Sequence, residues 1–185
     1  HKIIKKLTLG FDPSLFTNKQ LNTYFGDSLR LKPINKNLID EFYQVKTTKT
    51  KPFYSLDNKI TGQNYKSKIN KISKILKLNK VDYLFISAPE NVAWTLNIRG
   101  HDNPNSPIPN CRLIIGKNKK LFLIAKKAKT LKIIKEKKLS KNQIIDPENF
   151  LSLINKLKGS KFIIDSLSCS ILNENIIRSR FKIIN

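Results

Sequence analysis

The sequence is poor in the residues that give reactive or cross-linked proteins: its 185 residues include no methionine, one tryptophan, two histidines and two cysteines. Cys111 and Cys169 are too few and too far apart for a disulfide framework, and each lies beside an apolar run, so we expect both thiols to be reduced and packed in the core. This cysteine usage fits a cytoplasmic protein. The absence of methionine and a first residue that is His1 predict a fragment of a longer protein.

Side chains suited to metal binding or hydrolysis are equally scarce. Apart from the terminal histidine there is only His101, with Asp102 beside it, and the chain has no His-x-x-x-His motif, no cysteine pair at ligand spacing and no cluster of acids. Ser166 and Ser168 have no base nearby in the sequence, and the six glycines are dispersed rather than gathered in a phosphate loop. The sequence therefore predicts no catalytic and no metal-binding residue in this chain.

Long apolar runs are also missing, and acidic charge is low. No run approaches the length of a membrane-spanning helix and no signal peptide is visible, so we expect no membrane partner. The chain has 36 Lys and Arg against 13 Asp and Glu, a net charge of +23, but only five of these cations are arginines, which make the bidentate contacts to phosphate and guanine. The lysines are spread evenly among many Asn and Ile residues, as an AT-rich genome favours. We expect a lysine-coated surface that binds polyanions weakly and no specific nucleic acid.

The first part of the sequence predicts the end of a small α/β unit. Thr17 and Gln20 form a capping box for one helix, and Asn37 caps a shorter one. Strands are expected over 6–10 and 28–32. Residues 44–64 are rich in Lys and Thr, contain Pro52 and Gly62 and lack periodicity, which is typical of a linker.

The remaining residues alternate between patterns of strands and helices. Ile69, Ile72, Ile75 and Leu76 form an apolar stripe at helical spacing, and Asp146 followed by Pro147 predicts a helix start. Leu131 and Ile134 are the expected apolar contacts of a helix over 126–138. Strands are expected at 83–87, 112–116, 121–124, 144–145, 161–165 and 181–184, and a helix at 168–179. The short connection 117–119 predicts a hairpin, so we expect an α/β fold with a mixed sheet flanked by helices.

The segment between residues 87 and 112 differs from the rest in composition. It holds Trp94, the run Arg99-Gly100-His101-Asp102, and several prolines. Proline and asparagine argue against a helix or a central strand, so we expect a shaped loop on a rigid scaffold, which is where binding groups tend to lie.

Four segments resemble, in the same order, segments of a known family. They are LGFDPSLFT (9–17), LKPINKNLIDEFY (31–43), KPFYSLDNKITGQNYKSKINKI (51–72) and ENVAWTLNIRGHDNPNSPIP (90–109). They resemble the amino-terminal region of the three-domain Xaa-Pro aminopeptidases (aminopeptidase P), metal-dependent relatives of creatinase and prolidase. Phe16 stands where that family often has His, and Asn64-Tyr65 where it often has two small or hydroxyl residues.

The resemblance implies a creatinase-type amino-terminal domain preceded by the tail of a similar domain. Residues 1–44 would be the C-terminal part of the first domain, 45–64 a linker, and 65–185 the second domain. The catalytic pita-bread domain, with its divalent metal (manganese) held by Asp, Asp, His, Glu and Glu, would lie outside this chain. The parent enzyme would remove an N-terminal residue that precedes proline, and this chain alone would be inactive. The implied partners are its own catalytic domain, a peptide with proline in second position, and a second copy in a homodimer.

Within this resemblance, Arg99, His101 and Trp94 are the candidate substrate-binding residues. An arginine suits a peptide carbonyl or carboxylate, and an aromatic ring suits a prolyl ring. Other roles remain open: Trp94 packs in the core, and Arg99 ties down loop carbonyls, with Asp102 as the partner of either Arg99 or His101. For the whole chain, the alternative function is a stand-alone binding or assembly module with this fold.

Overall fold

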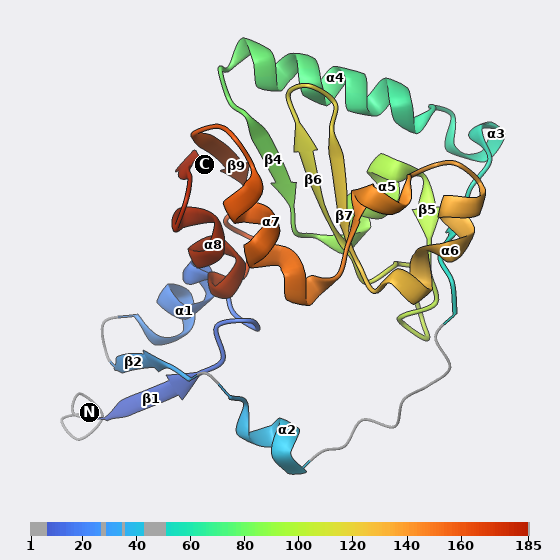
Figure 1. Cartoon of the computed structure of the whole chain (residues 1–185). Helices are drawn as coiled ribbons and strands as arrows, with labels where there is room; N and C mark the ends of the chain where they lie inside the picture. Colours follow the sequence, from blue (N-terminus) through green and yellow to red (C-terminus); the bar gives the residue numbers. More distant parts are fainter. Residues whose placement is uncertain (1–6, 27–28, 35, 43–50, 185) are drawn as a thin grey trace.

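The computed structural model describes residues 7–26, 29–34, 36–42 and 51–184, and its main feature is a mixed sheet of six strands in the order β10-β9-β4-β6-β7-β8 (Figure 1). The neighbours β10–β9, β9–β4 and β7–β8 are parallel, and β4–β6 and β6–β7 are antiparallel. The mixed α/β fold expected from the sequence is therefore confirmed. The strands are β4 (Tyr83–Ile86), β6 (Arg112–Gly116), β7 (Leu121–Ile124), β8 (Ile144–Ile145), β9 (Lys161–Ile164) and β10 (Lys182–Ile184).

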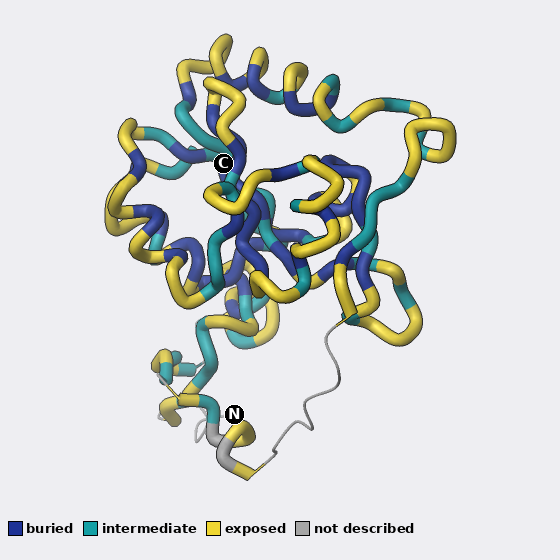
Figure 2. The backbone as a smooth tube through the Cα atoms, turned by 45° about the vertical axis from the view of Figure 1, so that its right-hand side comes forward, coloured by how far each residue is buried: buried dark blue, intermediate teal, exposed yellow. Residues whose placement is uncertain are grey.

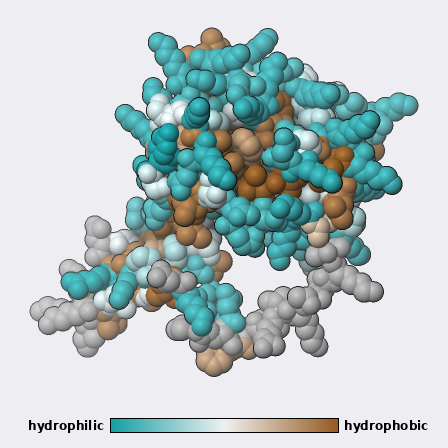
Figure 3. Space-filling view, in the orientation of Figure 1, coloured by the Kyte–Doolittle hydropathy of each residue, from teal (hydrophilic) through white to brown (hydrophobic). Residues whose placement is uncertain are grey.

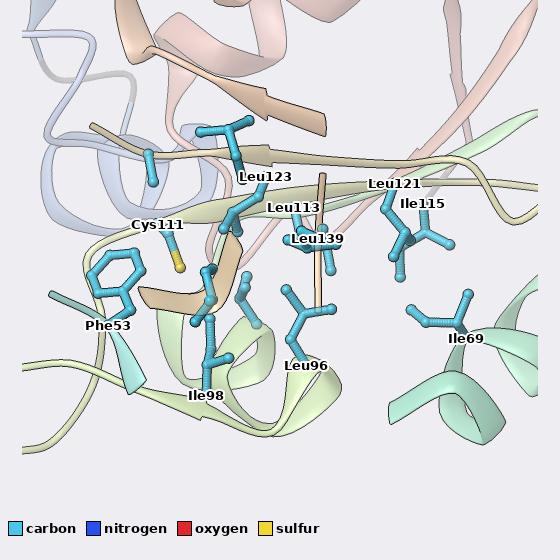
Figure 4. Packing of buried hydrophobic residues seen from close by; sticks show 14 residues of the cluster. Phe53, Ile69, Leu96, Ile98, Cys111, Leu113, Ile115, Leu121, Leu123 and Leu139 are labelled. Carbon is cyan, nitrogen blue, oxygen red and sulfur yellow. The ribbon is translucent and has the colours of Figure 1, made fainter. Parts of the chain in front are cut away.

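Helices cover both faces of this sheet because the strand residues alternate between two apolar clusters. In β7, Leu123 belongs to one cluster and Ile124 to the other. The helices of the first face are α4 (Tyr65–Leu78), α5 (Pro89–Leu96) and α6 (Lys127–Lys135), and those of the second are α7 (Phe150–Lys156) and α8 (Ile171–Arg178). Figure 2 shows the burial concentrated along the strands and the inner sides of the helices. Figure 4 shows Leu96 and Ile98 pointing toward the sheet in the first cluster.

Several local signals are confirmed. The Thr17 side chain caps α1 (Asn18–Phe25) and the Gln20 side chain accepts from the Thr17 backbone, which completes the capping box. Strands β6 and β7 form the expected hairpin. Cys111 and Cys169 are buried free thiols, and burial raises the pKa of each to about 12.

Other local predictions are partly wrong. The first part of the predicted loop after β4 is helical: Pro89 occupies the first turn of α5 (Pro89–Leu96), where its missing N–H breaks no bond, whereas residues 100–111 do form a loop. Ile75 and Leu131 are exposed, since Leu76 and Ile133 occupy the inward positions of α4 and α6. The helix start predicted at Asp146-Pro147 is confirmed, although the helix begins as a 3-10 turn (Pro147–Asn149). Only the side-chain cap is missing, because the Asp146 side chain accepts from the Lys127 backbone N–H instead.

Residues 51–64, which the sequence assigns to a linker, contain regular structure. Strand β3 (Tyr54–Ser55) pairs antiparallel with β5 (Ile98–Arg99), and α3 (Asn58–Thr61) follows. Phe53 is fully buried in the first cluster. We therefore propose that the second structural unit begins near residue 51 rather than 65.

The N-terminal residues form a smaller unit beside α8 (Figure 1). Strands β1 (Thr8–Phe11) and β2 (Arg30–Pro33) form a parallel pair, and α1 connects them in the sequence. Helix α2 (Leu38–Phe42) follows β2. Ile171 N and Leu172 N at the start of α8 donate to the carbonyls of Phe16 and Pro13, both at 2.9 Å. Among the described residues, no helix combines the length and apolar character required to cross a bilayer.

Candidate functional site

The candidate residues lie around the C-terminal end of α5 and the short ribbon that follows it. Helix α5 ends at Asn97, which has a left-handed backbone (φ 52°). Strand β5 then pairs with β3 so that Arg99 lies opposite Tyr54. Opposed residues of an antiparallel pair share one face, so Arg99 and Tyr54 project from the same side of the ribbon.

Trp94 is exposed, with 58% of its surface accessible, so the prediction of simple core packing is wrong. Its ring lies over the ammonium of Lys68 from α4, with 3.9 Å between Nζ and the ring centroid. Lys68 is only 3% exposed, and its Nζ donates to the carbonyl of Trp94 at 2.6 Å and to Oδ1 of Asn97 at 2.8 Å. The indole therefore forms an outer cover over a buried cation.

Arg99 also turns toward the end of α5. Its Nη1 donates to the carbonyl of Ile98 at 2.8 Å and to that of Ala93 at 3.4 Å. This geometry matches the alternative in which Arg99 ties down backbone carbonyls.

A third cation completes the group: Lys138 Nζ donates to the carbonyls of Leu96 at 2.9 Å and Asn97 at 3.1 Å. Three basic side chains thus satisfy carbonyls at the negative end of a helix. Burial lowers the pKa of Lys68, and the charge of Arg99 lowers it further. Burial likewise lowers the pKa of Lys138, with Glu136 opposing and Lys68 adding to the effect.

His101 is exposed and follows β5 after Gly100. Its ring stacks on Tyr54, with 5.3 Å between centroids and 30° between planes. The two rings line a shallow open depression of about 340 Å³ together with Lys51, Pro52 and Lys132. This depression offers a ligand two aromatic rings and two flanking lysines.

Asp102 is the partner of neither Arg99 nor His101, so that prediction is wrong. It accepts from the Asn110 N–H at 2.6 Å and from the ammonium of Lys129. Gly100 is needed for packing, since a Cβ there would lie 2.7 Å from the Cα of Pro109. The Arg-Gly-His-Asp run is therefore held by close backbone contacts within its loop.

The structure brings Trp94 and Arg99 together around Lys68 and places His101 beside Tyr54. The sequence did not predict that Lys68, Asn97, Lys138 and Tyr54 are neighbours of these candidates. One signal was available: Lys68 occupies a position within the apolar stripe of α4, between Tyr65 and Ile69.

A metal does not fit the side chains of the described residues, which include no group of three or more His, Cys, Asp or Glu arranged to hold an ion. The arrangement at the end of α5 supplies hydrogen-bond donors, an indole face and a stacked imidazole.

Comparison with known proteins identifies the fold family. Residues 44–184 match the Creatinase/Prolidase N-terminal domain. The chain belongs to this family. Similar curated proteins are Protein pid-5 of Caenorhabditis elegans (30% identical over 128 residues, 66% of this chain and 12% of the relative) and Xaa-Pro aminopeptidase app-1 of the same organism (31% identical over 112 residues, 58% and 18%). The chain thus spans less than a fifth of the length of these relatives.

A solved structure shares the fold over nearly the whole chain. It is the X-prolyl aminopeptidase of C. elegans, described as a cytosolic enzyme with a di-nuclear active site. The similarity has a TM-score of 0.79 at 22% identity and covers 98% of this chain and 32% of that one. The creatinase-type fold and the relation to Xaa-Pro aminopeptidases expected from the sequence are confirmed.

Proposed function

We propose that this chain is the non-catalytic amino-terminal part of a metal-dependent Xaa-Pro aminopeptidase, which removes an N-terminal residue that precedes proline. The observation that carries the proposal is the family match over 44–184, combined with similarity to a small part of much longer aminopeptidases. In this proposal the divalent metal, manganese, belongs to a catalytic domain outside the chain. The protein would act in the cytoplasm, like the C. elegans enzyme described as cytosolic.

The described elements support the domain organisation in this proposal. The parallel pair β1–β2 with α1 between them is a β-α-β unit, which suits the end of a first α/β domain. The second domain would run from about residue 51 to the last described strand.

Within the second domain, we propose that His101, Arg99 and Trp94 face the substrate pocket of the catalytic domain. Support comes from the exposed indole and from the stacked pair His101–Tyr54 at an open depression. Arg99 contributes by holding the end of α5, which positions the indole, so its action on substrate would be indirect.

The test is a chimera in which this chain replaces the equivalent amino-terminal region of C. elegans Xaa-Pro aminopeptidase app-1. We expect the chimera, but not the isolated chain, to release the N-terminal residue of an X-Pro peptide in the presence of manganese. His101→Ala should lower kcat/KM about tenfold, as loss of one substrate contact predicts. Lys135→Ala, on the exposed side of α6, is the matched control and should leave kcat/KM unchanged.

Two results would contradict the proposal. Turnover by the isolated chain would place catalytic residues within it. A folded, metal-bound chimera without activity would show that this chain does not serve as the amino-terminal region of such an enzyme.

A further inference from the structure

The second face of the sheet is only partly covered, because α7 and α8 are short. Beyond α7, above β7 and β8, a depression of about 580 Å³ remains, and Figure 3 shows apolar surface between hydrophilic side chains in the middle of this face. Its apolar floor consists of Tyr83, Phe122, Ile145, Leu153 and Leu157. This volume is in the range of ligand pockets and accommodates one or two large side chains.

Lysines from two segments of the chain stand at the rim of this depression. Lys117 and Lys120 come from the turn between β6 and β7, and Lys156 and Lys158 from the end of α7 and the residues after it. All four are exposed.

The single carboxylate at the rim, Asp82, is already engaged. It accepts from Lys117 Nζ at 2.8 Å and from the backbone N–H groups of Ser160 and Lys161 at 2.8 and 3.0 Å. Within the described part of the chain, the ammonium groups of Lys120, Lys156 and Lys158 have no hydrogen-bond or ion-pair partner. The depression therefore combines an apolar floor with uncompensated positive charge at its rim.

We propose that this depression binds an acidic peptide segment in which one or two large apolar side chains are flanked by Asp or Glu. The apolar side chains fill the floor and remove its surface from water. The flanking carboxylates meet the lysines at the rim. Several lysines from two segments match a peptide with several carboxylates better than a ligand with a single head group. The proposal goes beyond the aminopeptidase function and does not depend on it.

The apolar floor is what separates this site from the general positive surface. Lysines cover much of the molecule, so any polyanion binds weakly and without preference. Only a site with an apolar floor distinguishes a peptide with large apolar residues from an equally charged peptide without them.

The test uses the intact chain and a fluorescein-labelled octapeptide with Phe-Leu flanked on each side by three acidic residues. Binding is measured by fluorescence anisotropy at near-physiological salt, where surface charges are screened beyond about 8 Å. We expect saturable binding below about 1 mM, weakened about tenfold when Ala-Ala replaces Phe-Leu. The double substitution Lys120→Glu with Lys156→Glu should also weaken binding at least about tenfold.

The control is Lys71→Glu with Lys74→Glu on α4, which covers the other face. It changes the net charge by the same amount and affects only exposed residues, so we expect less than about a threefold loss. Equal losses in both double variants, equal binding of the Ala-Ala peptide, or no binding up to about 1 mM would each overturn the proposal. The same variants are tested with a duplex DNA. If Lys120→Glu with Lys156→Glu weakens DNA binding more than Lys71→Glu with Lys74→Glu does, the proposal is overturned in favour of a nucleic-acid surface.

Discussion

At the scale of single residues, a lysine lies among the inward-facing side chains of α4 and ends beneath an exposed indole. Lys68 shares the inner side of the helix with Tyr65, Ile69 and Leu76, so its alkyl chain is buried while its ammonium reaches two oxygens. The position within an apolar stripe is visible in the sequence. Its partners are not, because Trp94 and Asn97 lie 26 and 29 residues further along the chain.

Lys68→Met should change the dependence of stability on pH. Burial lowers the pKa of Lys68 from its usual 10.5, so the unfolded chain binds this proton more tightly than the folded chain. The free energy of unfolding therefore rises as the pH increases from the folded-state pKa toward the unfolded-state pKa. Relative to the variant, the wild type should therefore gain stability between pH 7 and about 10. Urea unfolding of both proteins at the two pH values measures this, with exposed Lys71→Met as the control. A difference in the free energy of unfolding between the two proteins that is the same at both pH values would contradict the prediction.

Arg99→Ala should destabilise the fold. The guanidinium donates to two carbonyls near the end of α5, and loss of charged hydrogen bonds of this kind costs about 1–2 kcal/mol in the free energy of unfolding. Urea denaturation is the measurement. Arg30→Ala, an exposed arginine of β2, serves as the comparison and should change stability by less than about 0.5 kcal/mol. An unchanged urea midpoint for Arg99→Ala would show that these hydrogen bonds do not contribute to the free energy of unfolding.

At the scale of elements, the sequence predicts best where the signal is local. The capping box at Thr17 and the hairpin at 117–119 each lie within a few residues, and both are present. Pro89 is an ambiguous signal, because the residue that breaks the interior of a helix also favours the first turn of one. The pairing of Tyr54 with Arg99 had no local signal, since two-residue strands carry no alternation.

Two substitutions of Asn97, the residue that ends α5, should separate the contribution of its side-chain hydrogen bonds from that of its left-handed backbone. Its side chain bonds to Lys68, to Thr61 Oγ1 at 3.0 Å and to the Gln63 carbonyl at 2.7 Å, and its backbone is left-handed. Both variants lose the side-chain bonds, at about 2 kcal/mol. Asn97→Gly also removes the Cβ from the left-handed region, so we expect it to be about 1 kcal/mol more stable than Asn97→Ala. Thermal and urea unfolding compare the two. Equal stabilities would mean that the backbone strain is relieved elsewhere.

At the scale of the whole molecule, two units meet at the start of α8. Carbonyls of Pro13 and Phe16 satisfy helix N–H groups there, and Asn18 donates to Glu174 at 3.1 Å. These bonds join the β-α-β unit to the larger sheet without any shared strand pairing among the described residues.

A chain that begins at Lys51 should fold on its own and unfold cooperatively. It keeps both apolar clusters and loses only the partners of α8, so we expect a decrease of about 1–3 kcal/mol in the free energy of unfolding. Circular dichroism with urea titration measures this against the full chain. A non-cooperative transition would show that the domain boundary is misplaced.

The position of β9 in the sheet has a consequence for how the protein is made. β9 lies between β4 and β10, yet it follows β4 in the sequence only after the hairpin, β8 and three helices. On the ribosome, the β6–β7 hairpin emerges early and covers one side of β4, while the other side, with the sequence Tyr-Leu-Phe-Ile, stays open. An open apolar strand edge is a template for pairing with other chains. The nascent protein therefore carries a half-paired central strand until translation has passed residue 164, and this interval is when it most needs protection from aggregation.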